Sequence, residues 1–198
     1  MTPEAEKESR APKDSVAGCR RWLIVGASGA GKSRLAREMG ELLALPVIHL
    51  DRHFWSSGWV EPDRQQWARQ VEELSSGDAW IMDGNYGGSI ALRLPRAEVA
   101  VMLDPPVWQC LWGILRRSTI YRGESRPDMA EGCEERLPYW AFIRYVLTYK
   151  WRSRPRVLER VAAESHVRFY HLKSRRAARR FMSDLRDAVQ VAAAGESG

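Results

Sequence analysis

Short apolar runs alternate with amphipathic stretches along the chain. The apolar runs, which predict strands, are residues 22–25, 46–50, 79–82, 99–103 and 167–171. The amphipathic stretches, which predict helices, are residues 32–45, 62–75, 105–121, 139–151, 155–164 and 174–193. In the first of these, Leu35, Met39 and Leu42 recur at helical spacing. This alternation is typical of a parallel sheet with crossover helices, so the pattern predicts an α/β fold.

The two ends and one internal stretch lack such a pattern. Residues 1–19 are rich in Glu, Lys, Pro and Ser and predict a disordered tail, so that 20–194 form a single domain. The stretch 122–138 is polar, contains glycine and proline, and has no clear period. We interpret it as a mobile loop or short lid, and with the end of the preceding helix the predicted lid covers 117–137.

One segment fits the phosphate-binding pattern G-x-x-x-x-G-K-[ST]. Its residues are Gly26, Ala27, Ser28, Gly29, Ala30, Gly31, Lys32 and Ser33. The glycines let backbone N–H groups converge on phosphates, Lys32 adds a positive charge, and the Ser33 hydroxyl is a ligand for Mg²⁺. The alternative is a chance match in a Gly/Ser turn. The preceding strand and the following helix argue against it, so the segment predicts binding of ATP with Mg²⁺.

Three predicted strands are followed by an aspartate: Asp51, Asp83 and Asp104. Ligands of open parallel sheets bind outside the carboxyl ends of the strands. We interpret Asp83 as a carboxylate that serves the magnesium site, with Asp-Gly turn chemistry as the alternative. For Asp51, two interpretations stay equally open: a role in orienting or deprotonating an acceptor hydroxyl, and a loop residue paired with Arg52 or a backbone N–H. For Asp104, which precedes Pro105, an ordinary helix N-cap is favoured.

Arginines gather where the predicted lid begins. Arg116, Arg117, Arg122 and Arg126 lie at the end of one predicted helix and in the loop after it. Arginines that close over a transferring phosphoryl group stabilise its charge, which favours a functional interpretation. A solvated basic face is the alternative.

The segment after the second predicted strand combines aromatic, basic and acidic side chains. It and the strand after it supply candidates for an acceptor pocket: Asp51, His53, Phe54, Trp59, Arg64, Asp83 and Tyr86. The alternative is that the tryptophans only pack this insertion onto the core, and we expect both to hold in part. No His, Cys or carboxylate cluster has metal-ligand spacing, so no structural metal held by the protein is expected.

Composition adds broad limits. The 198 residues are 44% hydrophobic, which suits one packed domain. The net charge of +6 favours an anionic ligand without naming it, and most basic residues are Arg, which suits phosphate. The three cysteines predict free thiols in a reducing compartment. The chain start lacks the apolar core of a signal peptide, and no apolar run is long enough for a bilayer, so we expect a cytoplasmic protein without membrane contact.

The sequence resembles the adenylate-kinase-related P-loop proteins often labelled DNA topology modulation proteins, over about residues 22–185. Besides the phosphate loop, the segments that carry the resemblance are 50–55, 58–62, 80–86, 103–104, 116–117, 126–129 and 132–133. The most specific are Asp-Gly-Asn-Tyr at 83–86 and Arg-Pro-Asp-Met at 126–129. The resemblance implies a three-layer P-loop kinase fold with a five-stranded parallel sheet in the order 2-3-1-4-5.

The resemblance also implies roles for individual residues. It implies an acceptor-binding insertion at 51–75 and a lid in which Arg116, Arg122 and Arg126 act on the phosphates, with Arg117 contacting ATP. It places Asp83 at the magnesium site and the segment 172–175, with Lys173 and Ser174, near the adenine. Adenylate kinases carry Asp-Gly-Phe-Pro-Arg where this chain has Asp-Gly-Asn-Tyr-Gly, which argues against AMP as the acceptor.

Three functions follow, in this order. The first is a nucleoside monophosphate kinase-like phosphotransferase, in which Lys32, Asp51 and the lid arginines move the γ-phosphoryl group of ATP to a nucleotide or another small acceptor. The second is a nucleic-acid-associated ATPase or regulator of DNA topology, although no nucleic-acid-binding motif occurs. The third is a nucleotide-binding protein without turnover. The sequence leaves a monomer and a homodimer open.

Overall fold

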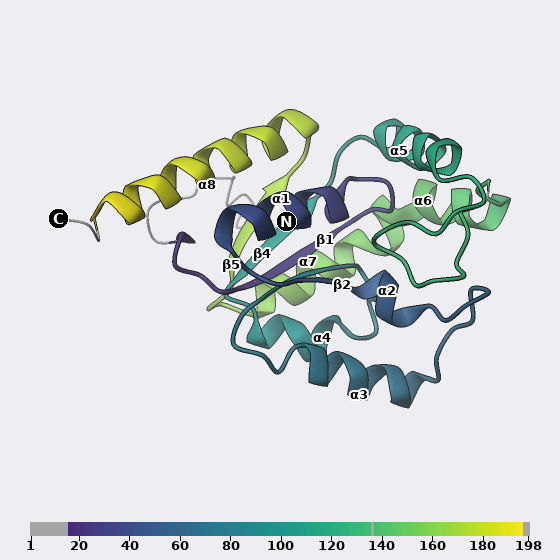
Figure 1. The fold of residues 1–198 in the computed structure, drawn as a ribbon, viewed down its shortest axis with the longest axis horizontal. Helices are drawn as coiled ribbons and strands as arrows, with labels where there is room; N and C mark the ends of the chain where they lie inside the picture. Colours follow the sequence, from purple (N-terminus) through teal and green to yellow (C-terminus); the bar gives the residue numbers. More distant parts are fainter. Residues whose placement is uncertain (1–15, 136, 196–198) are drawn as a thin grey trace, which may run out of the picture.

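The computed structural model describes residues 16–135 and 137–195 (Figure 1). Within these residues, one parallel sheet has the strand order β2-β3-β1-β4-β5. Its strands are β1 (Arg21–Gly26), β2 (Val47–His49), β3 (Trp80–Asp83), β4 (Val99–Leu103) and β5 (Arg168–Leu172). The predicted order 2-3-1-4-5 is therefore confirmed.

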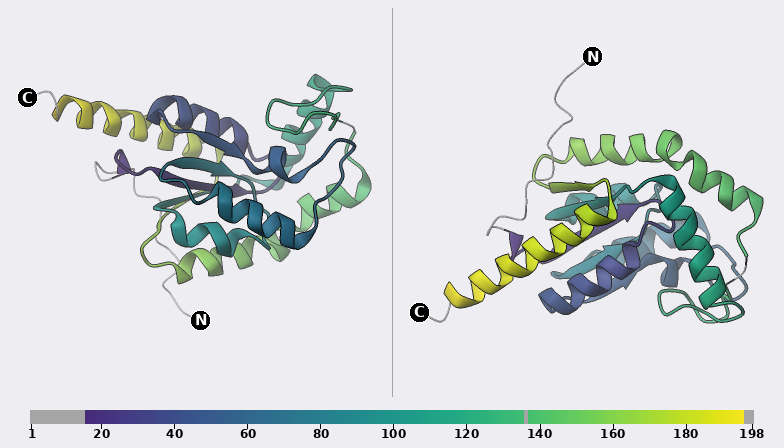
Figure 2. Two further views of the ribbon diagram at one scale, coloured as in Figure 1. Left: turned by 60° about the horizontal axis from the view of Figure 1, so that its bottom comes forward. Right: turned by 90° about the horizontal axis from the view of Figure 1, so that it is seen from above.

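Helices cover both faces of the sheet (Figures 1 and 2). They are α1 (Lys32–Leu43), α2 (Leu50–Phe54), α3 (Arg64–Leu74), α4 (Ile90–Arg93), α5 (Val107–Ile120), α6 (Trp140–Arg152), α7 (Arg154–Ala163) and α8 (Arg175–Gly195), with a 3₁₀ turn at Leu94–Arg96. Helices α1 and α8 pack on one face, and α3, α4 and α7 on the other. Helices α5 and α6 contact each other and extend past the carboxyl ends of the strands.

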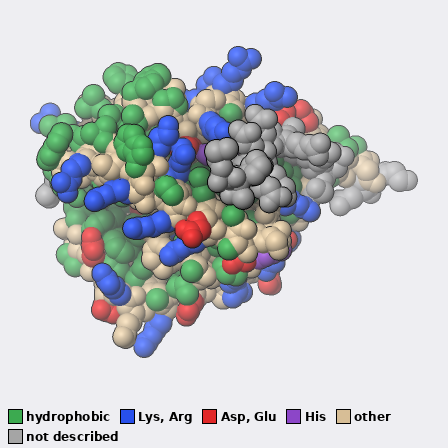
Figure 3. Space-filling view, turned by 180° about the vertical axis from the view of Figure 1, so that it is seen from behind, with side chains coloured by type: hydrophobic (Ala, Val, Ile, Leu, Met, Phe, Trp, Pro, Cys, Tyr) green, Lys and Arg blue, Asp and Glu red, His purple; other side chains and the backbone are tan. Residues whose placement is uncertain are grey.

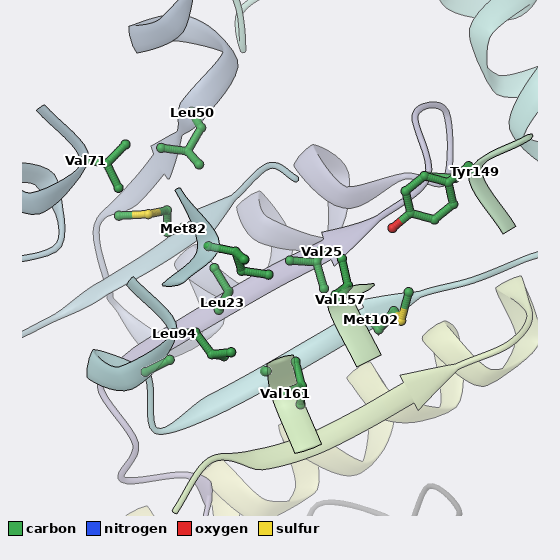
Figure 4. Close-up of a cluster of buried hydrophobic side chains, with 14 of the residues drawn as sticks. Leu23, Val25, Leu50, Val71, Met82, Leu94, Met102, Tyr149, Val157 and Val161 are labelled. Carbon is green, nitrogen blue, oxygen red and sulfur yellow. The ribbon is translucent and has the colours of Figure 1, made fainter. Parts of the chain in front are cut away.

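The strands are buried on both sides, which is why their sequences read as apolar runs. In β1, Leu23 and Val25 join the cluster under α3, α4 and α7, and Trp22 and Ile24 join the cluster under α1 and α8. Figure 4 shows part of the first cluster. Burying each such side chain contributes about 2 kcal/mol relative to leaving it exposed. The carboxyl ends of the strands are thus held rigidly, and the loops that leave them start from fixed positions.

Two element boundaries differ from the prediction near the second strand. The predicted strand 46–50 is shorter, because the chain turns into α2 at Leu50. Asp51 therefore lies in the first turn of a short helix and not at a strand end. The next helix, α3, begins after Asp63, whose side chain accepts hydrogen bonds from the backbone N–H groups of Gln65 and Gln66, at 2.8 and 3.3 Å.

The prediction that Asp104 caps a helix is wrong. The N-cap of α5 is Pro106, and it makes no side-chain cap hydrogen bond. Asp104 Oδ2 instead accepts from Arg154 Nη1 and interacts with His171 Nε2, both at 2.9 Å. The carboxylate thus joins β4, β5 and α7, because a buried cation–carboxylate pair is a stronger partner than two N–H groups at a helix start.

Only residues 16–19 of the predicted tail 1–19 belong to the part of the chain that the structure describes. Residues 1–15 lie outside the described residues. Val16 and Cys19 are buried against the cluster under α1 and α8, so the packed chain begins ahead of residue 20. Across the described ranges, no helix has the length and apolar character required to cross a membrane.

Candidate active site

The phosphate loop joins β1 to α1 and depends on glycine for two reasons. Gly26 and Gly29 have φ angles of 142° and 78°, which L side chains rarely adopt. A Cβ at Gly26 would lie 2.1 Å from the carbonyl oxygen of Leu103, and one at Gly29 would lie 2.2 Å from that of Cys110. The loop is therefore pressed between β4 and α5.

Lys32 opens α1 and lies among acidic groups. Its Nζ donates to the carbonyl oxygen of Ala27 at 3.1 Å. Burial lowers the pKa of Lys32, while Asp51 and Asp83 act in the opposite direction. Since both carboxylates are near enough to act on the amine, the structure brings these three residues to one place at the carboxyl end of the sheet.

Asp83 is the last residue of β3 and pairs with a histidine on the neighbouring strand. Its Oδ1 lies 2.6 Å from Nδ1 of His49, and its side chain is 5% exposed. Burial lowers the pKa of His49, but the hydrogen bond and the charge of Asp83 outweigh burial and raise it overall. His49 thus holds the Asp83 carboxylate in one orientation.

Ser33 and two carboxylates gather where the resemblance places magnesium. The Ser33 side chain lies near enough to act on the pKa of Asp128, which comes from the loop between α5 and α6. Burial raises the pKa of Asp128, but the charge of Arg126 and the Ser33 hydrogen bond lower it overall. Hydroxyl and carboxylate oxygens are the donors that Mg²⁺ prefers, and Mg²⁺ takes its other ligands from phosphates and water. Ser33, Asp83 and Asp128 therefore fit a magnesium ion carried in by ATP.

Asp51 has a specific partner. The hydroxyl of Tyr86 donates to Asp51 Oδ1 at 2.6 Å. Burial and the Asp51 charge raise the pKa of Tyr86 far above its ordinary value, so the phenol keeps its proton. The Asp51 carboxylate is thereby fixed in orientation through its Oδ1 atom.

Hydrogen bonds hold the segment after β3 next to the phosphate loop. The side-chain oxygen of Asn85 accepts from the N–H of Gly26 at 2.9 Å. Arg93 of α4 is fully buried, and its Nη2 donates to the carbonyl oxygens of Gly84 and Asn85. Burial lowers the pKa of Arg93 to about 9. Arg93 therefore holds the turn that presents Asn85 to the phosphate loop.

A cavity of about 970 Å³ opens from the phosphate loop across the carboxyl end of the sheet. Its lining includes Ser28 and Lys32 of the phosphate loop, Asp51, Tyr86, and residues of α6 and α7. Its size is at the upper end of the range for small-molecule sites. The cavity therefore has room for an acceptor beside the phosphates of a nucleotide.

Two arginines in the cavity wall share one buried carboxylate. Arg117 Nε lies 2.9 Å from Glu135 Oε1, and Arg126 Nε lies 2.8 Å from Glu135 Oε2. Arg126 also pairs with Asp128 at 3.1 Å. Burial and the neighbouring Arg126 lower the pKa of Arg117, and the Glu135 carboxylate counteracts this effect. Both arginines are thus held in place before any phosphate arrives.

The loop between α5 and α6 also contacts the insertion after β2. The N–H of Gly58 donates to the carbonyl oxygen of Gly132 at 3.0 Å, and the indole N–H of Trp59 donates to that of Glu134 at 3.1 Å. Cys133 Sγ donates to the carbonyl oxygen of Ser56 at 3.2 Å. The two segments thus meet along one rim of the cavity.

The predicted site residues fall into three groups. Those that line the cavity are Ser28, Lys32, Asp51, Trp59, Tyr86, Arg117 and Arg126. Those adjacent to it, in the phosphate loop and at the end of β3, are Gly26, Ala27, Gly29, Ala30, Gly31, Ser33 and Asp83. Those that the structure does not bring to the cavity lining are Arg116, Arg122, Arg64, His53, Phe54, Lys173 and Ser174.

The third group has clear structural surroundings. Arg64, Arg116, Arg122 and Lys173 are exposed. The Ser174 hydroxyl accepts from the N–H of Ala177 at 3.0 Å and begins α8. The ring of Phe54 packs 5.0 Å from that of Trp67 and 4.5 Å from that of Tyr86, measured between centroids.

Sequence reasoning missed several residues of the site. Asn85 and Asp128 stand inside the two most specific motifs, but their partners Gly26 and Ser33 are distant in sequence. No sequence pattern singles out Glu135, because its role depends on Arg117 and Arg126, which only the fold brings next to it. The aromatic residues of α6 follow a helical period, which by itself predicts only an amphipathic helix.

The comparisons with known proteins bear on the fold. No protein-family model matches the chain, and no curated protein matches its sequence. Among solved structures, the chain is similar to shikimate kinase from Acinetobacter baumannii in complex with shikimate, with a TM-score of 0.55 and 17% identity over 91% of this chain and 98% of that one. It also matches a gluconokinase from Sinorhizobium meliloti 1021 at 14% identity, over 90% of this chain and 95% of that one, with a TM-score of 0.48 that carries no argument. The chain therefore has the P-loop kinase fold.

Proposed function

We propose that this chain is an ATP-dependent phosphotransferase that acts on a hydroxyl group of a small molecule. One observation carries the proposal: a phosphate loop, an oriented carboxylate and two fixed arginines meet at a single cavity. Each has a separate task in phosphoryl transfer, and a nucleotide-binding scaffold without turnover needs only the first.

In the proposed reaction, the acceptor oxygen attacks the γ-phosphorus of ATP. A bond forms between them, the bond from the γ-phosphorus to the bridging oxygen breaks, and ADP leaves. The proton of the acceptor hydroxyl goes to Asp51, which Tyr86 holds in position. Lys32, Arg117 and Arg126 line the cavity, and their positive charges would stabilise the charge on the transferring phosphoryl group. Magnesium, held by Ser33 with Asp83 and Asp128, would neutralise phosphate charge.

The finer assignments belong to the same proposal. A nucleoside monophosphate kinase-like acceptor and membership of the adenylate-kinase-related DNA topology modulation family stay predictions from the resemblance. Arg93 is the first arginine after β3. It is buried behind the 84–86 turn and does not line the cavity. This position gives no direct support to a monophosphate as the acceptor.

The central test is ADP release from ATP·Mg²⁺ with a panel of acceptors. The panel contains nucleoside monophosphates, nucleosides, hydroxy acids and polyols, and duplex DNA is a separate arm. We expect release that depends on one acceptor class and that falls by about 1,000-fold in a Lys32→Ala variant, because Lys32 is the cation at the phosphate loop.

The matched control is Lys150→Ala, since Lys150 is exposed on α6 and does not line the cavity. It is expected to keep wild-type activity. Full activity in Lys32→Ala would overturn the proposal. Release that rises only with DNA would favour the nucleic-acid-associated ATPase, and ATP binding without release would favour the scaffold.

A further inference from the structure

One wall of the cavity is a row of aromatic rings. Tyr139, Phe142, Tyr145 and Tyr149 all line the cavity, from the start of α6 along the length of that helix. Consecutive ring centroids are 6.1, 6.4 and 6.3 Å apart, and the Phe142 and Tyr145 rings are stacked. We call these four residues the aromatic wall. None of the steps in the proposed phosphoryl transfer requires it.

The aromatic wall differs from a wall of core residues in its exposure. Tyr139 and Tyr145 are 70% and 40% exposed, although each contacts another ring. On the face that Figure 3 shows, hydrophobic side chains with Lys and Arg among them gather on the side where α5 and α6 lie. An exposed aromatic surface inside a cavity is the surface that a ligand with a flat apolar body covers.

The most buried residue of the aromatic wall, Tyr149, carries a hydroxyl group whose hydrogen bonding is incomplete. Tyr149 is 2% exposed, and its hydroxyl makes no hydrogen bond of acceptable geometry within the described residues, although the side chain of Asn85 is near. Burial raises the pKa of Tyr149 above its ordinary value, so the hydroxyl keeps its proton. Buried hydroxyl groups normally have a partner, which makes this one a donor for a ligand.

The helix after the aromatic wall, α7, contributes two arginines to the cavity lining. Arg156 and Arg160 are one turn apart on α7 and both line the cavity. Arg160 donates to the carbonyl oxygen of Gly87, and neither arginine forms an ion pair with the described residues. The acidic side chains that line the cavity, namely Asp51, Glu61 and Glu135, come from other elements. The α6–α7 side of the cavity is therefore aromatic and positively charged.

We propose that the acceptor site takes a molecule with an aromatic body and an anionic group, the body lying on Phe142 and Tyr145 and the anion facing Arg156 and Arg160. This inference deepens the proposed function, because it names the acceptor class of that site. Arginines suit carboxylate, sulfonate or phosphate equally, so the shared chemistry is an aryl anion.

A pair of fluorescent probes tests the site without ATP. 8-Anilinonaphthalene-1-sulfonate and N-phenyl-1-naphthylamine share one aromatic body, and only the first carries an anion. We expect the sulfonate to bind at one site, about tenfold more tightly than the neutral amine, since a hydrogen-bonded charge contributes that much to affinity.

Variants separate the two parts of the site. The double variant Arg156→Gln with Arg160→Gln is expected to lose about tenfold in sulfonate affinity and to keep its affinity for the neutral amine. Tyr145→Ala is expected to weaken both probes by about fivefold. If Tyr145→Ala does not fold, Tyr139→Ala replaces it, because Tyr139 is largely exposed.

The matched controls lie on α6 outside the cavity lining. They are Trp151→Ala, for a side chain that is 73% exposed, and Arg152→Gln, for an exposed arginine. Neither should change the affinity of either probe. Equal binding of the two probes, or a loss in Trp151→Ala as large as in Tyr145→Ala, would overturn the inference, because the probes would then bind an apolar surface elsewhere.

An ADP-release assay links the site to turnover. It compares 4-hydroxyphenyllactate with gluconate, which are hydroxy acids with and without an aromatic body. Release that depends on Lys32 with the aryl acid supports both proposals. Release with gluconate alone leaves the phosphotransferase standing and overturns the aryl acceptor. Release with neither acid, together with the expected probe pattern, supports the aryl-anion site and counts against the phosphotransferase for these acids.

Discussion

Asp51 and Tyr86 form a pair that the chain separates by 35 residues and the fold joins at 2.6 Å. One comes from α2, after the second strand, and the other from the turn after β3. A carboxylate that a hydrogen bond holds in one orientation is prepared to take a proton in one direction. The pair therefore explains, at the scale of single residues, why Asp51 is the base in the proposed reaction.

Replacing Asp51 by Asn removes the base and keeps the size of the side chain. We expect kcat to fall by about 100- to 10,000-fold with little change in ATP binding, because proton transfer is lost while the phosphate loop is intact. Steady-state ADP release and ATP titration measure the two quantities.

The control for Asp51→Asn is Asp78→Asn, because Asp78 is exposed and does not line the cavity. Tyr86→Phe is expected to lower kcat less than Asp51→Asn does, since it loosens the carboxylate without removing it. A variant Asp51→Asn that retains wild-type kcat would assign the base elsewhere.

At the scale of elements, the described part of the loop between α5 and α6 makes specific contacts with other parts of the chain. Glu135 is 4% exposed and forms ion pairs with both Arg117 and Arg126. The contacts of Gly58 and Trp59 tie the same loop to the insertion after β2. The stretch reads as a mobile lid from its composition, because partners distant in sequence supply its order.

Glu135→Gln should destabilise the protein by about 3 kcal/mol, because it leaves two largely buried guanidinium groups without their counter-charge. Urea unfolding followed by tryptophan fluorescence measures the free energy. The neighbouring variant Glu134→Gln is the control, since Glu134 is exposed. An equal loss in both variants, or none in Glu135→Gln, would show that the paired arginines do not depend on Glu135.

At the scale of the whole molecule, packing controls the chemistry of the thiols. The side chains of Cys19, Cys110 and Cys133 are buried. Burial raises the pKa of Cys19 and of Cys110. The reactive species is the thiolate, so a raised pKa means that less of it is present at a given pH than for an ordinary thiol.

The thiols of Cys19 and Cys110 should therefore react with iodoacetamide at pH 8 about 100-fold more slowly in the native protein than in urea. The rate should rise with pH only beyond the ordinary thiol pKa, because both shifts are upward. Mass spectrometry of timed samples gives the rate at each cysteine. Fast labelling of Cys110 in the native protein would contradict the packing of α5 against the phosphate loop.

Much of the donor half of the site could be predicted from sequence. The phosphate loop is contiguous, and each of its residues acts through its own backbone or side chain, so a local pattern identifies it. Asp83 follows from the rule that ligands bind at the carboxyl ends of parallel strands. Lys173 and Ser174 follow only from the resemblance, and the structure does not place them in the cavity lining.

The sequence by itself determined the α/β class, the strand order implied by the resemblance, and the phosphate loop, because periodicity and local motifs express the energetics of neighbouring residues. Only the tertiary structure decided which arginines face the cavity, that Tyr86 holds Asp51, and that Asn85 holds Gly26. It also placed the aromatic wall of α6 in the same cavity as Ser28 and Lys32 of the phosphate loop. These facts depend on contacts between residues 35 or more positions apart or on the direction of helix faces, and a linear pattern carries neither.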